Sequence, residues 1–475
     1  DETENDSGGQ DDGWEDDGTE AESVDSKVSV KDAGQYGSHS QDALNENLNN
    51  DRLDKDFGEH DTSSYNLLAP TKEQIEDSIV PYLEVKMSRM ANTDFVSAMK
   101  TLEGNYDNRY QPKDTLEEFR KFNATSKRFV NSLKMEFEMK KSAYQYTRAT
   151  VAKTGKLDVN ALHAYKYSED IFNSVTTLAD AKSHGMIFLI DMSGSMSHVI
   201  GTIYKQAINL SMFCKAVGIP FKVYGFTSNY YGANKKKDYD LQKGQIDMKT
   251  LHMTELLSSD LKKSVWKEAL FHMFVASEVW SRGEPSRMES MGGTPLSLAT
   301  VALMKKVKDF QAQHKIEKTS IMYLTDGSGN RMDVHDQWGG VGIGKLNGSM
   351  FQMERQYSSD EALVNHLKKT TGATLTHFFL IDNKSGPRQA GYPSLSNDEW
   401  KEIKKTKIVT RDGAGGFDRI FLIKNERVNL MDANDFSEIQ TDGMKDHQLL
   451  NAFKKNQTSR KNDRIFVNKF MEMVA

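Results

Sequence analysis

From His184 onward, short apolar runs alternate with stretches of helical periodicity. This pattern predicts strands at residues 186–190, 221–226, 321–324, 375–381 and 417–423, and helices near 198–217, 261–280, 295–310 and 359–369. Strands that are apolar on both faces and separated by helices are typical of a parallel sheet covered on both sides. The sequence therefore predicts an α/β fold with an open, mostly parallel sheet and helices on both faces, of the Rossmann-like kind.

The stretch before this region is helical in pattern, from Thr71 to about Lys141. Asp114-Thr-Leu-Glu117 matches a helix capping box, and apolar side chains then recur near the 3.6-residue period as far as Phe137. We expect a long amphipathic helix to begin here, with an apolar stripe that needs a partner surface. Residues 155–179 predict a turn, a short helix and a strand leading into the sheet.

The charge of the chain is divided between two regions of opposite sign. Residues 1–65 contain 20 acidic and 4 basic residues, a net charge of −16, whereas the other 410 contain 48 and 58, a net charge of +10. Residues 1–25 hold 12 acids and no base, and such a composition buries too little apolar surface to fold. We expect a disordered acidic tail or linker, which is either a solvated spacer or an interaction tail for a basic partner.

These patterns divide the chain into an acidic tail (1–65), a helical arm (66–180), an α/β domain (181–430) and a C-terminal helical segment (431–475). No apolar run approaches the roughly 20 residues that cross a bilayer, and no signal peptide is recognisable. The single Cys214 cannot form an internal disulfide, as in a reducing compartment. We expect a soluble, cytoplasmic protein. Because the chain opens on Asp1 rather than Met, we also expect a processed or truncated N-terminus with an upstream domain.

Three motifs lie at turns between predicted strands and helices. Asp191-Met-Ser193-Gly-Ser195 follows the first strand, Gly-Gly-Thr294-Pro-Leu precedes the 295–310 helix, and Asp326 follows the 321–324 strand. In open α/β sheets, ligands bind at the carboxyl ends of the strands. Two carboxylates and three hydroxyls are hard oxygen ligands, which suit Mg²⁺ or Mn²⁺. The sequence predicts a metal site with an open coordination position.

Each motif also has a purely structural interpretation. Thr294 could cap the helix that follows it, Ser193 and Ser195 could be helix caps, and Asp326 could belong only to a turn. The metal site is favoured because the order, the strand context and the spacing all agree.

The order Asp-x-Ser-x-Ser, then Thr, then Asp resembles the metal-ion-dependent adhesion site of the von Willebrand factor A family. The resemblance implies that Asp191, Ser193, Ser195 and Thr294 hold the ion directly or through water. It implies that Asp326 either binds the ion directly or contacts the residues that bind it. A carboxylate from a partner protein commonly completes the coordination in that family.

Further segments resemble the C-terminal half of the T subunit of aerobic cobaltochelatase (CobT-like proteins), over roughly residues 119–423. They are residues 126–133, the Gly155-Lys-Leu-Asp158 turn, residues 191–196 and residues 218–227. The resemblance implies a partner, a ring-forming AAA+ ATPase of the MoxR/cobaltochelatase S type. In such complexes ATP hydrolysis drives cobalt insertion into a corrin ring by a separate large subunit, in cobalamin biosynthesis. This chain would then be a non-catalytic subunit.

Two enzymatic motifs are incomplete. Residues 339–346 have the Gly-x4-Gly-Lys skeleton of a phosphate loop, but Leu346 stands where Ser or Thr would bind Mg²⁺. We expect a glycine-rich surface turn there. A phosphatase with Asp191 as nucleophile would carry a second Asp two residues later, where this chain has Ser193.

Other features favour no further activity. The 12 His show no ligand spacing for a zinc hydrolase, and Lys235-Lys-Lys237 comes with no nucleic-acid recognition motif. Cys214 shares a helical face with Ile203, Ala207 and Leu210, so we expect it in the core. Two alternatives to the chelatase subunit stay open: a general metal-dependent protein-binding module and a hydrolase.

Overall fold

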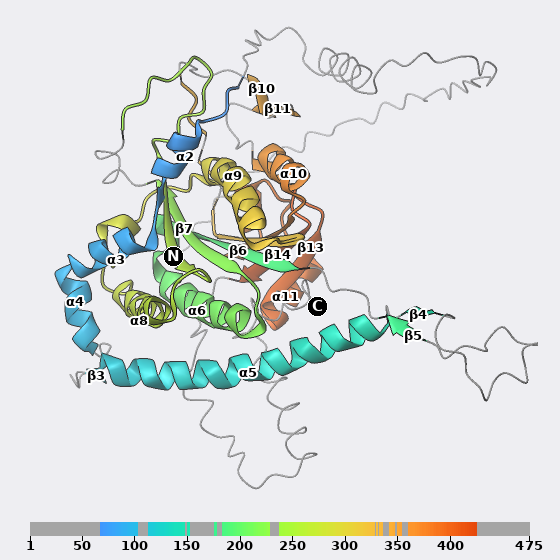
Figure 1. Ribbon diagram of the computed structural model, residues 1–475. Coiled ribbons are helices and arrows are strands. Elements are labelled where there is room, and N and C mark those ends of the chain that lie inside the picture. Colours follow the sequence, from blue (N-terminus) through green and yellow to red (C-terminus); the bar gives the residue numbers. More distant parts are fainter. Residues whose placement is uncertain are drawn as a thin grey trace, which may run out of the picture. The chain divides into compact units, whose positions relative to one another are not determined.

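The computed structural model describes residues 67–102, 113–147, 150–152, 175–177, 183–228, 237–327, 329–330, 332–335, 342–346, 349–353 and 360–424. The predicted acidic tail, the C-terminal segment and most of residues 155–179 lie outside this part of the chain. The helices that it contains are α2 (Lys72–Asp77), α3 (Tyr82–Met90), α4 (Thr93–Lys100), α5 (Thr115–Thr147), α6 (Ile200–Val217), α8 (Lys263–Val279), α9 (Leu296–His314), α10 (Asp360–Thr371) and α11 (Asn397–Thr406), with the 3-10 turns η2 (Gly194–His198), η3 (Arg287–Glu289) and η4 (Gly386–Ala390) (Figure 1). None of the described helices is long and apolar enough to span a bilayer.

An eight-stranded sheet has the order β1-β8-β7-β6-β9-β12-β14-β13. Its strands are β1 (Ile79–Val80), β6 (His184–Asp191), β7 (Phe221–Ser228), β8 (Leu251–Ser258), β9 (Lys318–Thr325), β12 (Thr374–Ile381), β13 (Ile408–Asp412) and β14 (Arg419–Lys424). Five of the seven neighbouring pairs are parallel; β8 runs antiparallel to β7, and β13 to β14. The predicted open, mostly parallel α/β sheet is confirmed.

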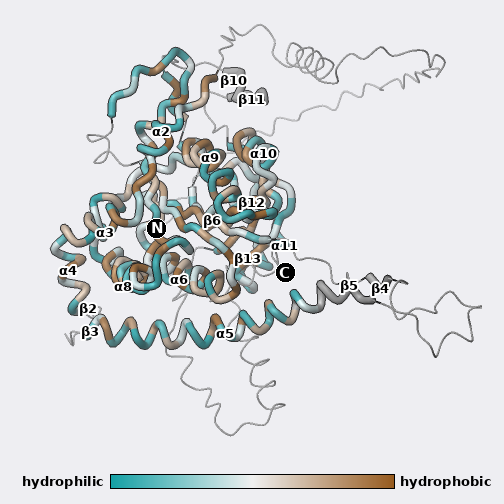
Figure 2. The backbone as a smooth tube through the Cα atoms, viewed as in Figure 1, coloured by the Kyte–Doolittle hydropathy of each residue, from teal (hydrophilic) through white to brown (hydrophobic). Residues whose placement is uncertain are grey.

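The core has two layers, one on each face of the sheet. Alternate residues of the central strand β6 divide between them: Phe188 and Ile190 pack with α6 and α8, whereas Ile187 and Leu189 pack with α9 and α10. Both faces of β6 are therefore buried, as its uninterrupted apolar run requires. Figure 2 shows the backbone of β6 between α9 on one side and α6 on the other.

The predicted strands correspond to β6, β7, β9, β12 and β14, and the predicted helices to α6, α8, α9 and α10, with ends shifted by a few residues. Four elements of the sheet layer are absent from the prediction: β1, β8, β13 and α11. Polar residues interrupt the apolar pattern of β8, yet His252 and Thr254 are buried there. A polar residue buried in a strand hides that strand from a search for apolar runs.

Helix α5 begins at the predicted place. The Asp114 side chain accepts a hydrogen bond from the Leu116 N–H at 2.9 Å, while Glu117 forms an ion pair with Lys121. The stripe is mostly buried, but Leu116 is 43% exposed and Phe119 is partly buried. Its buried residues are Phe122, Phe129, Leu133 and Phe137.

The partner surface of this stripe is formed by α6 and α8. The ring of Phe122 lies 5.1 Å from that of Phe274 on α8, and the ring of Phe137 lies 5.8 Å from that of Phe213 on α6. Figure 1 shows α5 running alongside α6. Residues of the arm and of the α/β region thus share one apolar core.

Two smaller expectations are corrected. Residues 342–346, predicted as part of a glycine-rich turn, form strand β10 (Gly342–Leu346), which pairs in a hairpin with β11 (Ser349–Met353). The strand expected within residues 155–179 is β5 (Val175–Thr177), which pairs with β4 (Thr150–Ala152) in a separate ribbon rather than leading into the main sheet. Short β-hairpins of this kind carry little apolar periodicity, so the sequence pattern does not reveal them.

Candidate metal site

The first part of the site is the end of the central strand. Asp191 is the last residue of β6, and its side chain is fully buried. Its Oδ1 accepts a hydrogen bond from the Ser193 N–H at 2.8 Å, which folds the chain back over the strand end. Ser193 occupies the cap position of η2 but makes no side-chain capping bond there. The cap interpretation of Ser193 is therefore not supported.

The second part is the loop that leads from α8 into α9, so the prediction that Thr294 lies at a turn between a strand and a helix is wrong. Thr294 is 5% exposed, and its hydroxyl lies 3.4 Å from Asp191 Oδ2, to which it donates. Helix α9 begins at Leu296 with Pro295 at its cap position and no side-chain capping bond. Thr294 therefore does not cap this helix, and its hydroxyl is directed to the carboxylate.

The third part is the end of β9. Asp326 follows the strand directly and accepts a hydrogen bond from the Ser195 hydroxyl at 2.6 Å. The hydroxyls of Ser195 and Ser193 lie 3.0 Å apart. The structure thus brings together all five predicted residues in one network, from Thr294 through Asp191 to Asp326.

Exposure increases across this network. Asp191, Ser193 and Thr294 are buried, Asp326 is partly buried, and Ser195 is exposed. The carboxylate of Asp191 therefore forms the floor of the site. A ligand arriving from solvent meets Ser195 and Asp326 first.

The electrostatics of the two carboxyls favour a cation between them. Burial, together with the charge of Asp326, raises the pKa of Asp191 to about 8, although hydrogen bonds from Ser193 and Thr294 oppose the shift. Burial also raises the pKa of Asp326, opposed mainly by the Ser195 hydrogen bond. Two acids held close together in a poorly solvated place resist ionisation, and a divalent ion would remove that penalty.

The donor set fits a hard cation. Among the described residues, no group of three or more His, Cys, Asp or Glu is placed to hold a metal. A cation at the strand ends would instead be held by two carboxylates and three hydroxyls. Mg²⁺ and Mn²⁺ accept such oxygen ligands and often retain water.

Three neighbours of the site were not predicted. Asp382 follows β12, and its charge contributes to the raised pKa of Asp326. Ser228 ends β7 and accepts the Gly293 N–H at 2.7 Å, and the Asn330 N–H donates to the Thr294 carbonyl at 2.6 Å. Asp382 could have been found, because it follows a predicted strand as Asp191 and Asp326 do.

A buried histidine supports the end of β9. His377 Nε2 lies 3.1 Å from the Thr325 hydroxyl, and its Nδ1 lies 2.7 Å from the Tyr392 hydroxyl. Burial lowers the pKa of His377 to about 3, so the ring is neutral near pH 7. It fixes the residue next to Asp326 without adding charge.

Cys214 is buried in the core against Met186, as predicted, and burial raises the pKa of its thiol.

Gly292 allows the loop that carries Thr294 to pass close to β7. A Cβ added at this position would lie 2.1 Å from the Ser228 carbonyl oxygen. We expect Gly292→Ala to lower the free energy of unfolding by about 1–3 kcal/mol, the usual cost of overpacking, because loop and strand must separate. The control is Gly194→Ala in the neighbouring loop, where nothing lies within 4 Å of the added Cβ. Urea unfolding of both variants tests this, and equal stabilities would contradict it.

Comparisons with known proteins add little to this geometry. No protein-family model matches the sequence, and no curated protein is similar enough to match it. Two solved structures are similar to part of this chain at low TM-scores. The pilus adhesin SpaC from Lactobacillus rhamnosus GG, in its open conformation, is 15% identical over 42% of this chain and 24% of its own, with a TM-score of 0.26. The human COPII-coat protein Sec24c is 11% identical over 52% of this chain and 30% of its own, also with a TM-score of 0.26. This chain spans less than a third of either protein, and neither likeness bears on its function.

Proposed function

We propose that this chain is a cytoplasmic, metal-dependent von Willebrand factor A subunit of the CobT-like type. In this proposal Asp191, Ser193, Ser195, Thr294 and Asp326 hold Mg²⁺ or Mn²⁺. The ion then grips a carboxylate on a MoxR-type AAA+ ATPase, within a complex of the cobaltochelatase type. The observation that carries the proposal is the convergence of these five oxygen-bearing side chains from two strand ends and the loop between α8 and α9.

The exposure gradient supports a role in binding rather than in chemistry. Asp191 is buried beneath the site, whereas Ser195 is exposed and Asp326 is partly buried. A bound ion would therefore be reached from the side of Ser195 and Asp326. A carboxylate on a partner protein suits that position, because it is a hard oxygen ligand and brings negative charge to the cation.

The division of labour follows from the same residues. The described part of the glycine-rich segment is strand β10, which leads into strand β11. A phosphate loop would lead into a helix instead. In the proposed complex the ATPase supplies the work of hydrolysis, a large subunit holds the corrin, and cobalt is the cargo. This chain supplies a docking point.

A general metal-dependent binding module is the second candidate. The loop Gly292-Gly-Thr294-Pro-Leu favours it, because these residues resemble the corresponding loop of generic A domains more than that of chelatase subunits. Such a module would bind a carboxylate on another protein and ignore the ATPase. A hydrolase is the third candidate, and in that case the isolated chain would turn over a substrate.

The proposal is tested by assembly with a MoxR-type ATPase, followed by light scattering. We expect the parent protein to form the complex and Asp191→Ala and Thr294→Ala to fail, because each removes a ligand of the bridging ion. Ser385→Ala is the matched control, since it removes an exposed hydroxyl from the loop after β12, outside the five residues. The two site variants are more informative than a chelator, because the ATPase needs Mg²⁺ for its own nucleotide. Assembly of both at full strength would contradict the proposal.

A further inference from the structure

We infer that Arg89 on α3 is a positioning residue for the candidate metal site, acting through Glu289. The inference rests on the proposed metal binding. Glu289 belongs to the loop between α8 and α9, residues 280–295, which is called the Thr294 loop here.

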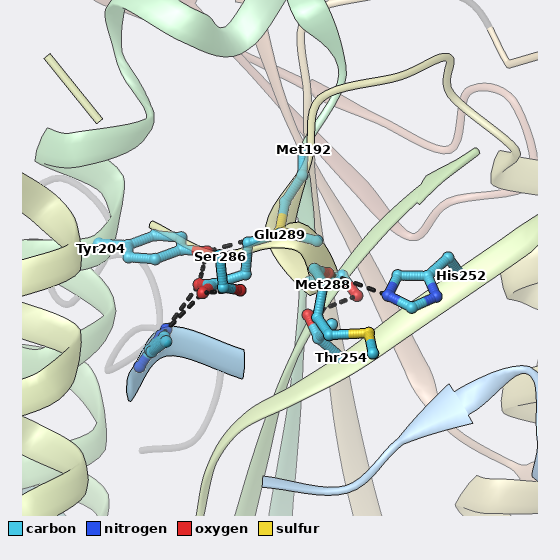
Figure 3. A network of polar contacts seen from close by, with 9 residues as sticks. Met192, Tyr204, His252, Thr254, Ser286, Met288 and Glu289 are labelled. Carbon is cyan, nitrogen blue, oxygen red and sulfur yellow. Dashed lines mark hydrogen bonds and ion pairs between the residues drawn. The ribbon is translucent and has the colours of Figure 1, made fainter. Parts of the chain in front are cut away.

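The ion pair is completely buried. Both side chains are 0% exposed, and Arg89 donates from Nε to Glu289 Oε2 at 2.7 Å and from Nη2 to Oε1 at 2.5 Å. The Tyr204 hydroxyl also donates to Oε1, at 3.0 Å, and the Ser286 hydroxyl to Oε2, at 2.9 Å. Figure 3 shows Tyr204 and Ser286 converging on the Glu289 carboxylate. Each carboxylate oxygen thus has two donors.

Such a pair fixes geometry more than it adds stability. Removing two charges from water costs about as much as their attraction returns, so a buried pair is weak support for a role in stability. The Glu289 carboxylate accepts from four donors, although Arg89 Nη1 makes no hydrogen bond in the described part of the chain. A carboxylate satisfied in this way favours one arrangement, because any other leaves a buried charge unpaired. Glu289 is therefore held in one place as long as Arg89 is present.

Glu289 reaches the metal site by two routes. Along the chain, it lies five residues before Thr294, and Gly292 between them accepts the Gly194 N–H at 3.0 Å. Across the fold, the Tyr204 hydroxyl that contacts Glu289 also lies 3.4 Å from Met192 Sδ, and Met192 stands between Asp191 and Ser193. One carboxylate is therefore connected to both loops that supply the buried ligands.

Other bonds near Arg89 hold the same loop. Asn92, which caps α4, donates from Nδ2 to the Glu284 carbonyl at 2.9 Å, and Glu284 Oε1 accepts the Met291 N–H at 2.8 Å. His252 Nε2 lies 2.9 Å from the Met288 carbonyl (Figure 3). Without Arg89, Glu289 would be a buried carboxylate with two hydroxyl donors and no positive charge beside it, and water would have to replace the guanidinium. The loop would have to open to admit that water, and Thr294 would move with it.

The experiment compares Arg89→Met with Arg411→Met. Arg411 forms a bidentate pair with Glu399, at 2.9 and 3.0 Å, between β13 and α11 and outside the site network. Mg²⁺ affinity is measured by titration calorimetry at a temperature at which circular dichroism shows both variants folded. Amide hydrogen exchange of residues 290–294 is measured without metal. We expect Arg89→Met to weaken Mg²⁺ binding at least tenfold and to speed exchange in residues 290–294, and Arg411→Met to change neither.

A double variant separates positioning from stability. Arg89→Met combined with Glu289→Leu removes both buried charges, so it should regain thermal stability while Mg²⁺ affinity stays low. If Arg89→Met does not fold, Mg²⁺ affinity is measured on the double variant instead. Recovery of full affinity by the double variant would overturn the inference, because the pair would then act through stability alone. Equal affinity of the parent and Arg89→Met would overturn the inference and leave the proposed function standing. A parent protein that binds no Mg²⁺ would overturn both.

Discussion

Replacing Asp191 with Asn is expected to weaken Mg²⁺ binding by two or more orders of magnitude and to stabilise the metal-free protein at pH 8. The first effect follows because the site loses its buried charge. A charge interaction at contact distance in a partly buried site amounts to several kcal/mol, and about 1.4 kcal/mol corresponds to a factor of ten in affinity. Asn keeps the size of the side chain and accepts the Ser193 N–H as Asp does, so the fold should survive.

The second effect follows from linkage between protonation and folding. The pKa of Asp191 in the folded protein is about 8, against 3.8 as the ordinary value, so the folded state retains a proton that the unfolded state releases. Stability from this group is complete below pH 3.8 and is lost as the pH rises toward 8, by an amount on the order of a few kcal/mol. Asn cannot ionise, and the variant keeps that stability.

Urea unfolding at pH 5, 7 and 8.5 measures both effects, in chelator and in Mg²⁺. We expect Mg²⁺ to stabilise the parent at high pH and to leave Asp191→Asn unchanged, because an ion that binds only the folded state stabilises it by mass action. Asp398→Asn is the control, since it removes an exposed carboxyl of α11 that lies outside the site network. Mg²⁺ affinity equal to that of the parent in Asp191→Asn would rule out the metal site.

Replacing Phe122 with Ala is expected to lower the free energy of unfolding by about 3–5 kcal/mol, as for other large-to-small changes in a core. Phe122 is 6% exposed and packs against Phe274 of α8, so its loss leaves a cavity between α5 and the helical layer. Met135 on the same helix is 68% exposed, and Met135→Ala should change stability by less than about 0.5 kcal/mol. Similar losses in the two variants, measured in urea, would mean that α5 does not belong to the core.

The candidate site could be predicted because its residues obey a local rule. Asp191 and Asp326 each follow an apolar strand, and parallel strands bring their carboxyl ends to one edge of the sheet. Strand context was therefore enough to group Asp191 and Asp326, whereas Thr294, on the loop between α8 and α9, joined them through the order of the motifs. The metal and the partner are a different matter, since they come from resemblance and stay proposals.

What supports the site could not be predicted, because the contacts join distant parts of the chain. Arg89 and Glu289 are 200 positions apart, and no local pattern pairs a helix residue of the arm with a 3-10 turn. The strand β8 was missed because its polar residues are buried, and the partner of the α5 stripe is known only once α6 and α8 are in place. Periodicity identifies a face that must be covered, and tertiary structure decides what covers it.

The position of β6 between β7 and β9 has a consequence for when the site exists during synthesis. The strand pairs with β7 soon after it in the chain, but its other neighbour, β9, begins at Lys318. Closing so long a loop is an unfavourable step that local contacts do not reward. Before that step, Asp191 does not have Asp326 beside it. A partner that grips an ion at this edge would therefore recruit only chains whose sheet is complete, and metal-dependent assembly would sort folded copies from unfinished ones.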